Sequence, residues 1–311
     1  MEIDMNATMQ TYPDKAAWVE AHRTGIGGRG ALSALGLDPF RSPLLYYAQL
    51  RGLAPETEPG AGVRWGLALE APVIQWYETE TGRKVERLPE WSLLRHPDLP
   101  FVIGTPDGFV DGAGTDLGRG VYEGKVTGIS HRDEWETEPP RGALVQVQHY
   151  LSITGYTWAS VAGLILGRPV EGRYHDIPRH EVFITAMLSQ LEAFWRRVHD
   201  RNPPPADSAE STRDALRMLF PRETVEAIDL PEEAGEIAVA YKAASAAEKD
   251  WKEKMADASN KLALIMGDAA EGRLPDGTRI TYKTVSRAAY SVEPHSGREL
   301  RIYPPKKGKG K

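Results

Sequence analysis

The chain has 311 residues, enough for one large domain or a domain plus an appendage, and a net charge of −6. Of its residues 41% are hydrophobic and 26% charged, a composition typical of a soluble globular protein. Because it contains no cysteine, disulfides, thiolate zinc sites and iron–sulfur clusters are excluded, and its acidic balance argues against non-specific binding of nucleic acid over the whole surface. No apolar run approaches the roughly 18 residues of a membrane helix and the N-terminus lacks a signal-peptide pattern, so we expect a cytoplasmic protein.

The acidic excess lies in the first 205 residues. Residues 206–311 carry 18 basic and 18 acidic residues, so the preceding part carries 38 − 18 = 20 basic and 44 − 18 = 26 acidic residues. In that part only Lys15, Lys84 and Lys125 are lysines, and the other cations are arginines. A partly buried lysine can exchange a proton, whereas an arginine stays charged. Lys125, two residues after an acid, is therefore a candidate for chemistry.

A glycine-rich loop follows a short helix that we predict over residues 12–22. Gly25, Gly27 and Gly30 satisfy the spacing G-x-G-x-x-G, but a dinucleotide site also needs a hydrophobic strand before the loop and a βαβ unit around it. Here the preceding segment is polar and helical, and nothing later resembles a βαβ repeat. The dinucleotide interpretation is therefore rejected.

The same loop remains a candidate anion site. Its glycines, Gly27 and Gly28 among them, precede a helix predicted over residues 31–35, and free backbone N–H groups at a helix start can hold an anion. Arg23 and Arg29 on either side favour phosphate as that anion. The alternative is a tight turn between two helices.

A longer helix is predicted over residues 64–81, where apolar residues recur at helical spacing. Pro72 predicts a kink or a restart inside it. Glu70 lies among apolar neighbours, unlike the solvent-facing Glu78 and Glu80. It is either a residue at the rim of the core or a third carboxylate of a nearby site.

Short strands follow, and they bring acids together with a lysine. They are predicted over residues 84–88, 92–94, 101–104, 108–110 and 121–126. Asp107 follows a proline directly before the fourth strand, and Glu123 and Lys125 point to the same face of the fifth. Two carboxylates and an amine at one place can hold a divalent cation and activate a water. The alternative is a hairpin with a structural salt bridge.

The remainder of the first domain is predicted as a helix over residues 142–154, strands over 157–166 and 173–177, and an amphipathic helix over 180–199. Gln146 and Tyr150 lie one turn apart on the first of these helices and project together. A run of prolines at 203–205 ends the domain. The predicted domains are residues 1–205 and a C-terminal extension, residues 206–311.

The extension is predicted to contain a short helix over residues 212–220, a long helix from Pro231 to about Met266 and a β-hairpin whose second strand covers 279–285. The long helix has one partly apolar side, which indicates packing against a partner helix or another subunit, with a solvated arm as the alternative. The basic tail Lys306–Lys311 is expected to be disordered and to solubilise the chain.

Five short motifs occur in a characteristic order. They are Arg23 with Gly25-Ile26-Gly27-Gly28, Leu69-Glu70, Pro106-Asp107-Gly108, Glu123-Gly124-Lys125 and the segment Gln146 to Tyr150. None is specific alone, but their order resembles the YqaJ-type viral recombinase domain. This is the family of phage lambda exonuclease, within the PD-(D/E)XK nucleases. The resemblance covers roughly residues 12–205, and a looser match continues after residue 231.

The resemblance implies an α/β (α+β) fold, in which a PD-(D/E)XK core with a central mixed β-sheet is flanked by helices and followed by the extension. At the matching positions it implies that Asp107, Glu123 and the Gly124 carbonyl are ligands of Mg²⁺ or Mn²⁺, and that Glu70 acts through a second ion or a water. It also implies that Lys125 orients and polarises the attacking water. Gln146 would position the DNA backbone or the lysine, and Tyr150 would support the helix.

The implied activity is a metal-dependent deoxyribonuclease that resects duplex DNA from 5′ ends in the host cytoplasm and leaves a 3′ single strand for a phage-type annealing protein. A ring-shaped homo-oligomer would suit processive resection. The alternatives are an endonuclease or a single-strand exonuclease on the same fold, and a non-catalytic DNA-binding or scaffold protein. Where the family usually has Gly-Ile-Gly-Gly-Ser-Asp, this chain has Arg29-Gly30 in place of Ser-Asp. The contact with a terminal 5′-phosphate is therefore the least determined part of the prediction.

Overall fold

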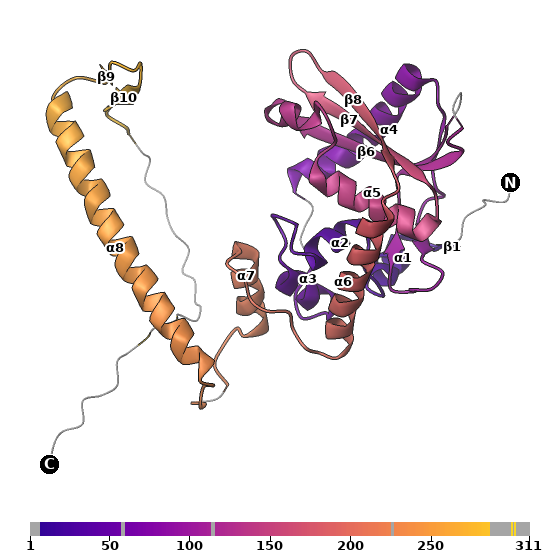
Figure 1. Ribbon diagram of the computed structural model, residues 1–311, viewed down its shortest axis with the longest axis horizontal. Coiled ribbons are helices and arrows are strands. Elements are labelled where there is room, and N and C mark those ends of the chain that lie inside the picture. The colour runs from indigo at the N-terminus through magenta and orange to yellow at the C-terminus, as the bar shows by residue number, and fades with distance from the viewer. Residues whose placement is uncertain are drawn as a thin grey trace. The chain divides into compact units, whose positions relative to one another are not determined.

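A mixed five-stranded sheet forms the centre of the N-terminal unit in the computed structural model, which describes residues 7–56, 60–112, 116–224, 227–286, 300 and 302 (Figure 1). In spatial order its strands are β2 (Val85–Glu86), β5 (Gly108–Asp111), β6 (Arg119–Gly128), β7 (Trp158–Leu166) and β8 (Glu171–Pro178). Only β6 and β7 run parallel, and the other neighbours are antiparallel.

The parallel pair is joined by a crossover that contains the 3₁₀ helix η1 (Ile129–Trp135) and the helix α5 (Arg141–Thr154). A hairpin reverses the chain and therefore joins antiparallel strands. Parallel neighbours need a longer crossover that returns the chain to the same end of the sheet. The described residues thus contain one βαβ unit where the sequence indicated none. The glycine-rich loop lies well before this unit, between α1 (Lys15–His22) and α2 (Gly28–Ala34), so the rejection of a dinucleotide fingerprint stands.

One face of the sheet is covered by α4 (Ala61–Thr81). Val73 and Tyr77 of this helix pack with Tyr122 and Trp158 of the sheet in a separate buried cluster. The restart predicted at Pro72 does not occur, because α4 is continuous from Ala61 to Thr81 and ends at Gly82, whose φ of 70° is left-handed.

The opposite face is covered by α5, which is buried along most of its length. α2 and α6 (Glu181–His199) pack against α5 in turn, and together they form the main core. Val147 and Leu151 of α5 and Leu191 of α6 are fully buried there. The sheet therefore lies between α4 and a helical layer, which places its middle strands β6 and β7 at the centre of the unit.

A second, small sheet has the order β1–β3–β4, with β1 (Thr8–Thr11), β3 (Ser92–Arg95) and β4 (Ile103–Gly104). Neither β1 nor the helix α3 (Pro43–Leu50) was predicted. Residues 8–11 show no period-2 apolar pattern, so β1 is specified by its pairing with β3 rather than by its own sequence. α3 does carry a start signal, because Ser42 accepts from the Leu45 N–H at 3.2 Å and Pro43 occupies the first helical position.

The helix α7 (Glu210–Leu219) belongs to the N-terminal unit rather than to the extension. It packs on α3, the Ser211 hydroxyl accepts from the Ser42 N–H at 2.9 Å, and Ala215 is fully buried. The contacts therefore divide the chain after Leu219 instead of after residue 205. The prolines at 203–205 mark a connection inside the unit.

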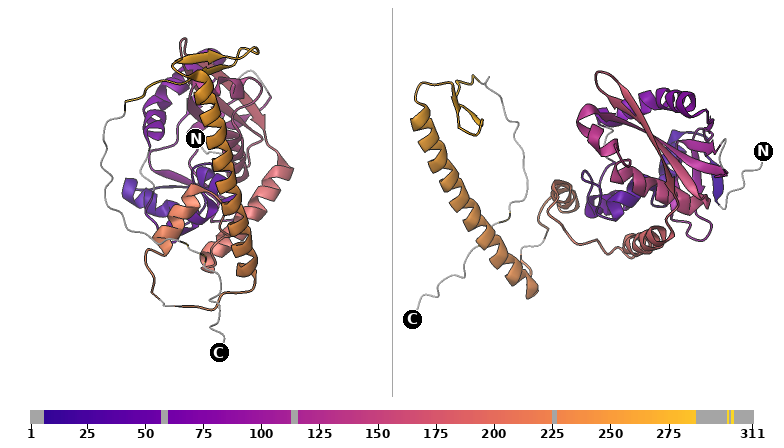
Figure 2. Two further views of the ribbon diagram at one scale, coloured as in Figure 1. Left: turned by 90° about the vertical axis from the view of Figure 1, so that its left-hand side faces the viewer. Right: turned by 45° about the horizontal axis from the view of Figure 1, so that its top comes forward.

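The C-terminal unit starts at Phe220 and contains α8 (Glu233–Met266), followed by a hairpin of β9 (Glu271–Arg273) and β10 (Arg279–Thr281) (Figure 2). Arg279 pairs with Arg273 in the antiparallel register of this hairpin. The predicted basic tail lies outside the described residues. Among the described helices, none combines the length and the apolar character that a membrane crossing requires.

A buried histidine on α5 gives the fold a testable pH dependence. Burial lowers the pKa of His149 to about 4, and its Nε2 lies 2.8 Å from the Ile103 carbonyl oxygen. In the unfolded chain the same group binds a proton near its ordinary pKa of about 6.5. Its contribution to stability is therefore full above pH 6.5 and is lost as the pH falls toward 4, by up to about 3 kcal/mol.

This contribution is measured by urea unfolding of the wild type, His149→Gln and His131→Gln at several pH values between 4.5 and 7.5. His131 is exposed on η1 and serves as the matched control. We expect the stability of His149→Gln to depend less steeply on pH than that of the other two proteins. Equal slopes in all three proteins would contradict the assignment.

Candidate active site

The second half of β6 has an open edge, and Asp107 occupies it. β5 begins at Gly108, which pairs with Tyr122, so beyond this point β6 has no strand neighbour on that side. The backbone N–H of Gly124 instead donates to Oδ2 of Asp107 at 2.8 Å. The end of one strand thereby fixes a carboxylate beside the middle of the next.

Glu123 and Lys125 alternate with Gly124 along β6 and point toward α5. The ammonium group of Lys125 donates to Oε1 of Glu123 at 2.5 Å and to Oε1 of Gln146 at 2.8 Å. The Gln146 amide donates in turn to the Tyr150 hydroxyl at 3.0 Å. A continuous polar chain therefore runs from the strand into the helix that covers it.

The two acids lie in an environment that disfavours their charges. Burial raises the pKa of Asp107 to about 8, and the Glu123 carboxylate adds to this shift while Lys125 opposes it. Burial also raises the pKa of Glu123, and Lys125 again acts in the opposite direction. One lysine does not compensate the buried carboxylate of Glu123 and the half-buried carboxylate of Asp107, and a bound cation would favour the charged form of both.

Two buried oxygen atoms at this site have no hydrogen-bond partner among the described residues: Oε2 of Glu123 and the hydroxyl of Tyr122. Glu123 is only 2% exposed, so water does not reach its free oxygen readily. A hard oxygen donor that is buried and unpaired is the donor that Mg²⁺ or Mn²⁺ takes in proteins. Glu123 and Asp107 therefore fit a divalent cation.

The sequence did not point to Tyr122 as a residue near the site. Its side chain lies on the opposite face of β6 from Glu123, toward α4, where its ring packs against that of Tyr77 at a tilt of 54°, with the ring centroids 5.0 Å apart. Its hydroxyl lies 3.5 Å from the position that a Cβ on Gly124 would take, close to Asp107. The only sequence signal was the strand period, which assigns Tyr122 to the α4 face.

Glu70 is held apart from the other two acids. Its carboxylate accepts a hydrogen bond from the half-exposed guanidinium of Arg87. Its charge nevertheless raises the pKa values of Asp107 and Glu123, though less than burial does, so it lies in their neighbourhood. No three acidic or histidine side chains of the described residues form a group with metal-holding spacing. The role of Glu70 as a third carboxylate stays a prediction.

Tyr150 connects this site to the glycine-rich loop. A Cβ on Gly28 would lie 2.8 Å from the Tyr150 hydroxyl, and one on Gly104 would lie 2.8 Å from the same ring, so only glycine permits this close approach. Gly27 has no such constraint, because the nearest atom is 4.0 Å away. The loop thus reaches the end of the polar chain that begins at Glu123.

The two arginines of the loop differ in their surroundings. Arg23 closes α1, where its guanidinium pairs with Glu20 at 3.1 Å and lies 3.9 Å from Glu56. Arg29 is exposed in the first turn of α2. Against the larger effect of burial, its charge lowers the pKa of Glu123, which places the guanidinium near the acids.

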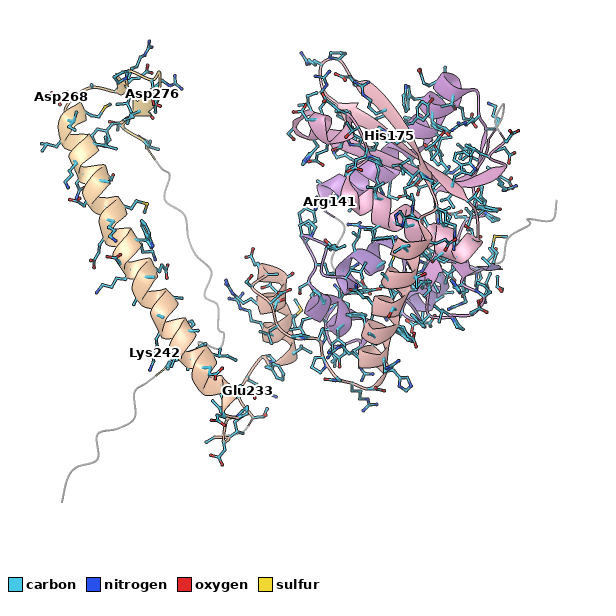
Figure 3. The ribbon with its side chains drawn as sticks, viewed as in Figure 1. Arg141, His175, Glu233, Lys242, Asp268 and Asp276 are labelled. Atoms are coloured by element: carbon cyan, nitrogen blue, oxygen red, sulfur yellow. The ribbon has the colours of Figure 1, made fainter. Side chains whose placement is uncertain are left out.

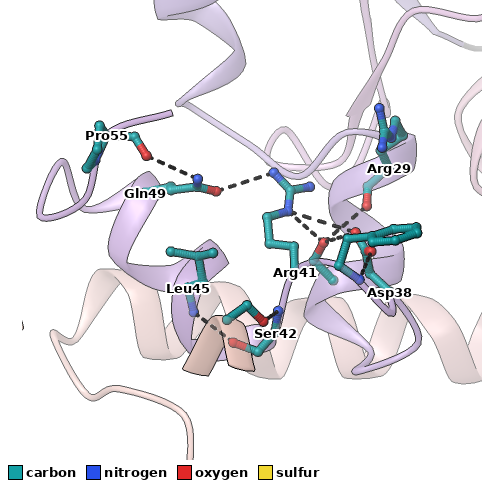
Figure 4. Close-up of polar contacts among 10 residues, drawn as sticks. Arg29, Asp38, Arg41, Ser42, Leu45, Gln49 and Pro55 are labelled. Atoms are coloured by element: carbon teal, nitrogen blue, oxygen red, sulfur yellow. Dashed lines mark hydrogen bonds and ion pairs between the residues drawn. The ribbon is translucent and has the colours of Figure 1, made fainter. Parts of the chain in front are cut away.

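A polar cluster fixes the chain after Arg29 (Figure 4). The Ser33 hydroxyl contacts the Arg29 carbonyl at 3.5 Å, donates to Asp38 at 2.9 Å and accepts from Arg41 at 2.8 Å. Ser33 is fully buried, so these contacts are shielded from water. The cluster holds α2, and with it Arg29, in place.

Comparison with known proteins relates this chain to a family. Residues 17–157 match the model of the YqaJ-like viral recombinase domain. The chain is also 30% identical over 219 residues to the uncharacterized protein YqaJ of Bacillus subtilis (strain 168), which corresponds to 68% of this chain and 66% of that protein. The chain thus spans about two thirds of the length of this curated relative.

A solved structure shows the same fold. The crystal structure of LHK-Exo in complex with dAMP matches with a TM-score of 0.50 at 20% identity, over 60% of this chain and 94% of that one. A second structure, of the alkaline exonuclease LHK-Exo from Laribacter hongkongensis, gives a TM-score of 0.49 at 21% identity over the same shares. The fold is of the PD-(D/E)XK type, and the predicted mixed sheet flanked by helices is confirmed.

Proposed function

Because the chain belongs to the family of YqaJ-like viral recombinase domains, we propose that it is a Mg²⁺-dependent deoxyribonuclease that degrades duplex DNA from its 5′ ends. The observation that carries this proposal is the polar chain of Glu123, Lys125 and Gln146 beside Asp107, in which a buried carboxylate oxygen of Glu123 has no hydrogen-bond partner among the described residues. Such a set of groups suits phosphodiester hydrolysis, which needs a nucleophile at neutral pH and neutralisation of developing charge.

Asp107 and Glu123 are the residues that would hold the cation, and the Gly124 carbonyl is proposed as a further ligand. A bound Mg²⁺ or Mn²⁺ supplies Lewis acidity and lowers the pKa of water. Lys125 orients the attacking water and donates hydrogen bonds to it. Gln146 fixes the lysine, because its side-chain oxygen accepts from Nζ at 2.8 Å while its amide is tied to Tyr150. Glu70 is proposed to contribute through a second ion or a water.

Substrate binding is assigned to the surface beside the glycine-rich loop. Arg29 offers an exposed guanidinium near the acids, and this geometry suits a DNA phosphate. α2 has only seven residues, so its dipole adds little, and Arg29 supplies most of the attraction. Arg23 is partly neutralised by Glu20 and Glu56 and is assigned a smaller share.

The choice of an exonuclease rests on the relatives. A structure with the same fold bears the name of an exonuclease and holds dAMP, the size of product that stepwise digestion releases. In phage-type recombination such resection leaves a 3′ single strand, and we propose that an annealing protein receives it. A ring-shaped homo-oligomer around the DNA would make the resection processive.

One panel of substrates tests this proposal. Linear duplex DNA with and without a 5′-phosphate, circular duplex DNA and single-stranded DNA are each incubated with the protein in Mg²⁺. We expect loss of linear duplex only, faster for phosphorylated ends, with nucleotides released from the 5′ strand. Cutting of circles would indicate an endonuclease, and digestion of single strands alone a single-strand exonuclease. DNA binding without cleavage would support the non-catalytic scaffold.

Arg29→Ala is expected to raise the KM for phosphorylated linear duplex about tenfold and to reduce the preference for phosphorylated over unphosphorylated ends, because it removes a charge-assisted contact worth roughly 1.5 kcal/mol. Its kcat should change little. Steady-state rates on the two substrates measure both effects. Arg23→Ala, which removes a guanidinium already paired with acids, should change KM less. A larger effect at Arg23 than at Arg29 would reverse this assignment.

A further inference from the structure

The helix α8 is the longest element among the described residues of the C-terminal unit. It extends for 34 residues, about 50 Å, and none of its residues is buried (Figure 3, from Glu233 to just before Asp268). A single helix in water gains little stability from propensity alone, and most helices are stabilised by packing an apolar face. The exposed apolar residues of α8 therefore show what kind of partner it has.

Six of the eight large exposed apolar residues of α8 repeat with the period of a coiled coil, and Val239 and Leu264 lie outside this pattern. Along α8 the steps between seam positions alternate strictly between four and three residues, which is the 3.5-residue period of two supercoiled helices. The seam, as we name this set, consists of Ile237, Tyr241, Ala244, Glu248, Trp251, Met255, Ala258, Leu262 and Ile265. All of these residues except Glu248 are apolar, and all are exposed. The pattern predicts another helix with a matching seam.

We propose that the partner is α8 of a second copy of this chain and that the two helices run antiparallel. In that orientation the seam positions of one helix meet the alternate seam positions of the other, so that the small Ala258 and Ala244 fall opposite the large Tyr241 and Met255. The resulting layers are Tyr241 with the partner's Ala258, Ala244 with the partner's Met255, Ile237 with the partner's Leu262, and Glu248 with the partner's Trp251.

The parallel alternative fails in four of its layers. It sets each seam residue against its own copy, so two Glu248 carboxylates would meet inside the seam and repel. It would also pair Trp251 with itself, while the layers at Ala244 and Ala258 would contain only two methyl groups. A seam in which some layers hold too much side-chain volume and others too little packs poorly. The antiparallel pair avoids both defects, and Glu248 keeps its 2.6 Å ion pair with Lys252 at the flank.

The flanking positions also permit the antiparallel pair. The lysines beside the seam are Lys252, Lys254 and Lys261. In the antiparallel register Lys252 faces the partner's Ser245, and Lys254 faces the partner's Ala247. No like charges oppose each other across the flanks, so the electrostatic cost of association is small. A second copy thus buries the apolar residues of the seam and leaves the charged flanking residues in water.

Matched charge substitutions in the full-length chain test the seam. Met255 lies in the seam and Val239 lies on the opposite side of α8, yet both are 69% exposed. Self-association of the wild type, Met255→Lys and Val239→Lys is measured by sedimentation velocity over a range of concentrations. We expect Met255→Lys to raise the dissociation constant at least tenfold and Val239→Lys to leave it unchanged. Association that is insensitive to Met255→Lys, or a wild type in which α8 remains unpaired, would overturn the proposal.

Single cysteines test the orientation, since the native chain has none. Tyr241→Cys and Ala258→Cys proteins of different mass are mixed and oxidised. The antiparallel register predicts a disulfide between the two variants and none within either variant alone, because equal positions lie about 25 Å apart. A disulfide within each variant alone would establish the parallel pair and overturn the orientation. Lys125→Ala should associate like the wild type, so this result is independent of the nuclease proposal.

Discussion

Asp107→Asn is expected to lower the kcat of DNA cleavage by roughly a hundred- to a thousandfold, because it removes a proposed metal ligand whose ion supplies several kcal/mol of transition-state stabilisation. The same change should stabilise the metal-free fold. Asp107 is half-buried near Glu123 and its pKa is raised to about 8, whereas an amide has no charge to desolvate and can still accept from the Gly124 N–H. We expect a gain of about 1 kcal/mol, or roughly 2–4 °C in Tm.

Asp111→Asn is the matched control for this variant. Asp111 lies on the adjoining strand β5 and is exposed, so the same substitution there should change neither the rate nor the Tm. The two measurements are steady-state cleavage of linear duplex in Mg²⁺ and thermal unfolding in EDTA. Loss of activity together with a lower Tm would indicate that Asp107 is a structural acid rather than a ligand.

Lys125→Ala is expected to lower kcat by roughly 10²–10³-fold, because it removes the group that we propose to orient and polarise the attacking water. Its effect on stability should be opposite to that of Asp107→Asn. Without the ammonium group, Glu123 loses its partner at 2.5 Å and Gln146 loses its donor at 2.8 Å. Since Lys125 is partly exposed, we expect a loss of about 1–2 kcal/mol rather than the larger cost of breaking a fully buried pair.

Lys84→Ala is the control for this second variant. Lys84 is exposed and pairs with Glu78 on α4, so its removal should leave the cleavage rate unchanged. Single-turnover cleavage separates the chemical step from DNA binding, and we expect the Kd for DNA to be similar for both lysine variants. An unchanged single-turnover rate in Lys125→Ala would remove the lysine from the proposed chemistry.

The sequence predicted the parts of the fold that local pattern determines. The helices containing Glu70 and Gln146 were predicted from helical apolar spacing, and the strand with Glu123 and Lys125 from its period of two. The parallel pairing of β6 with β7 was not predicted, because it depends on contacts between segments that α5 separates. β1 was missed for the same reason, since its strand character comes from pairing with β3.

At the site, the sequence predicted which residues are close but not how they are paired. Alternation along β6 put Glu123 and Lys125 on one face, and one helical turn put Gln146 beside Tyr150. The Arg87 contact that holds Glu70, and the unpaired Tyr122 hydroxyl near Asp107, both arise from tertiary packing. The contact of Arg23 with Glu56 likewise depends on tertiary packing, whereas its ion pair with Glu20, three residues before it, is local.

The central claim is that Asp107 and Glu123 hold a divalent cation, and that this cation together with Lys125 activates the water that cleaves DNA. The most direct measurement is the release of nucleotides from 5′-labelled linear duplex by the wild type in Mg²⁺, in EDTA, and in EDTA followed by excess Mg²⁺. We predict release in Mg²⁺, none in EDTA and full recovery after the metal is restored. Release that persists in EDTA, or a folded wild-type protein that releases nothing in Mg²⁺ or Mn²⁺, would contradict the claim.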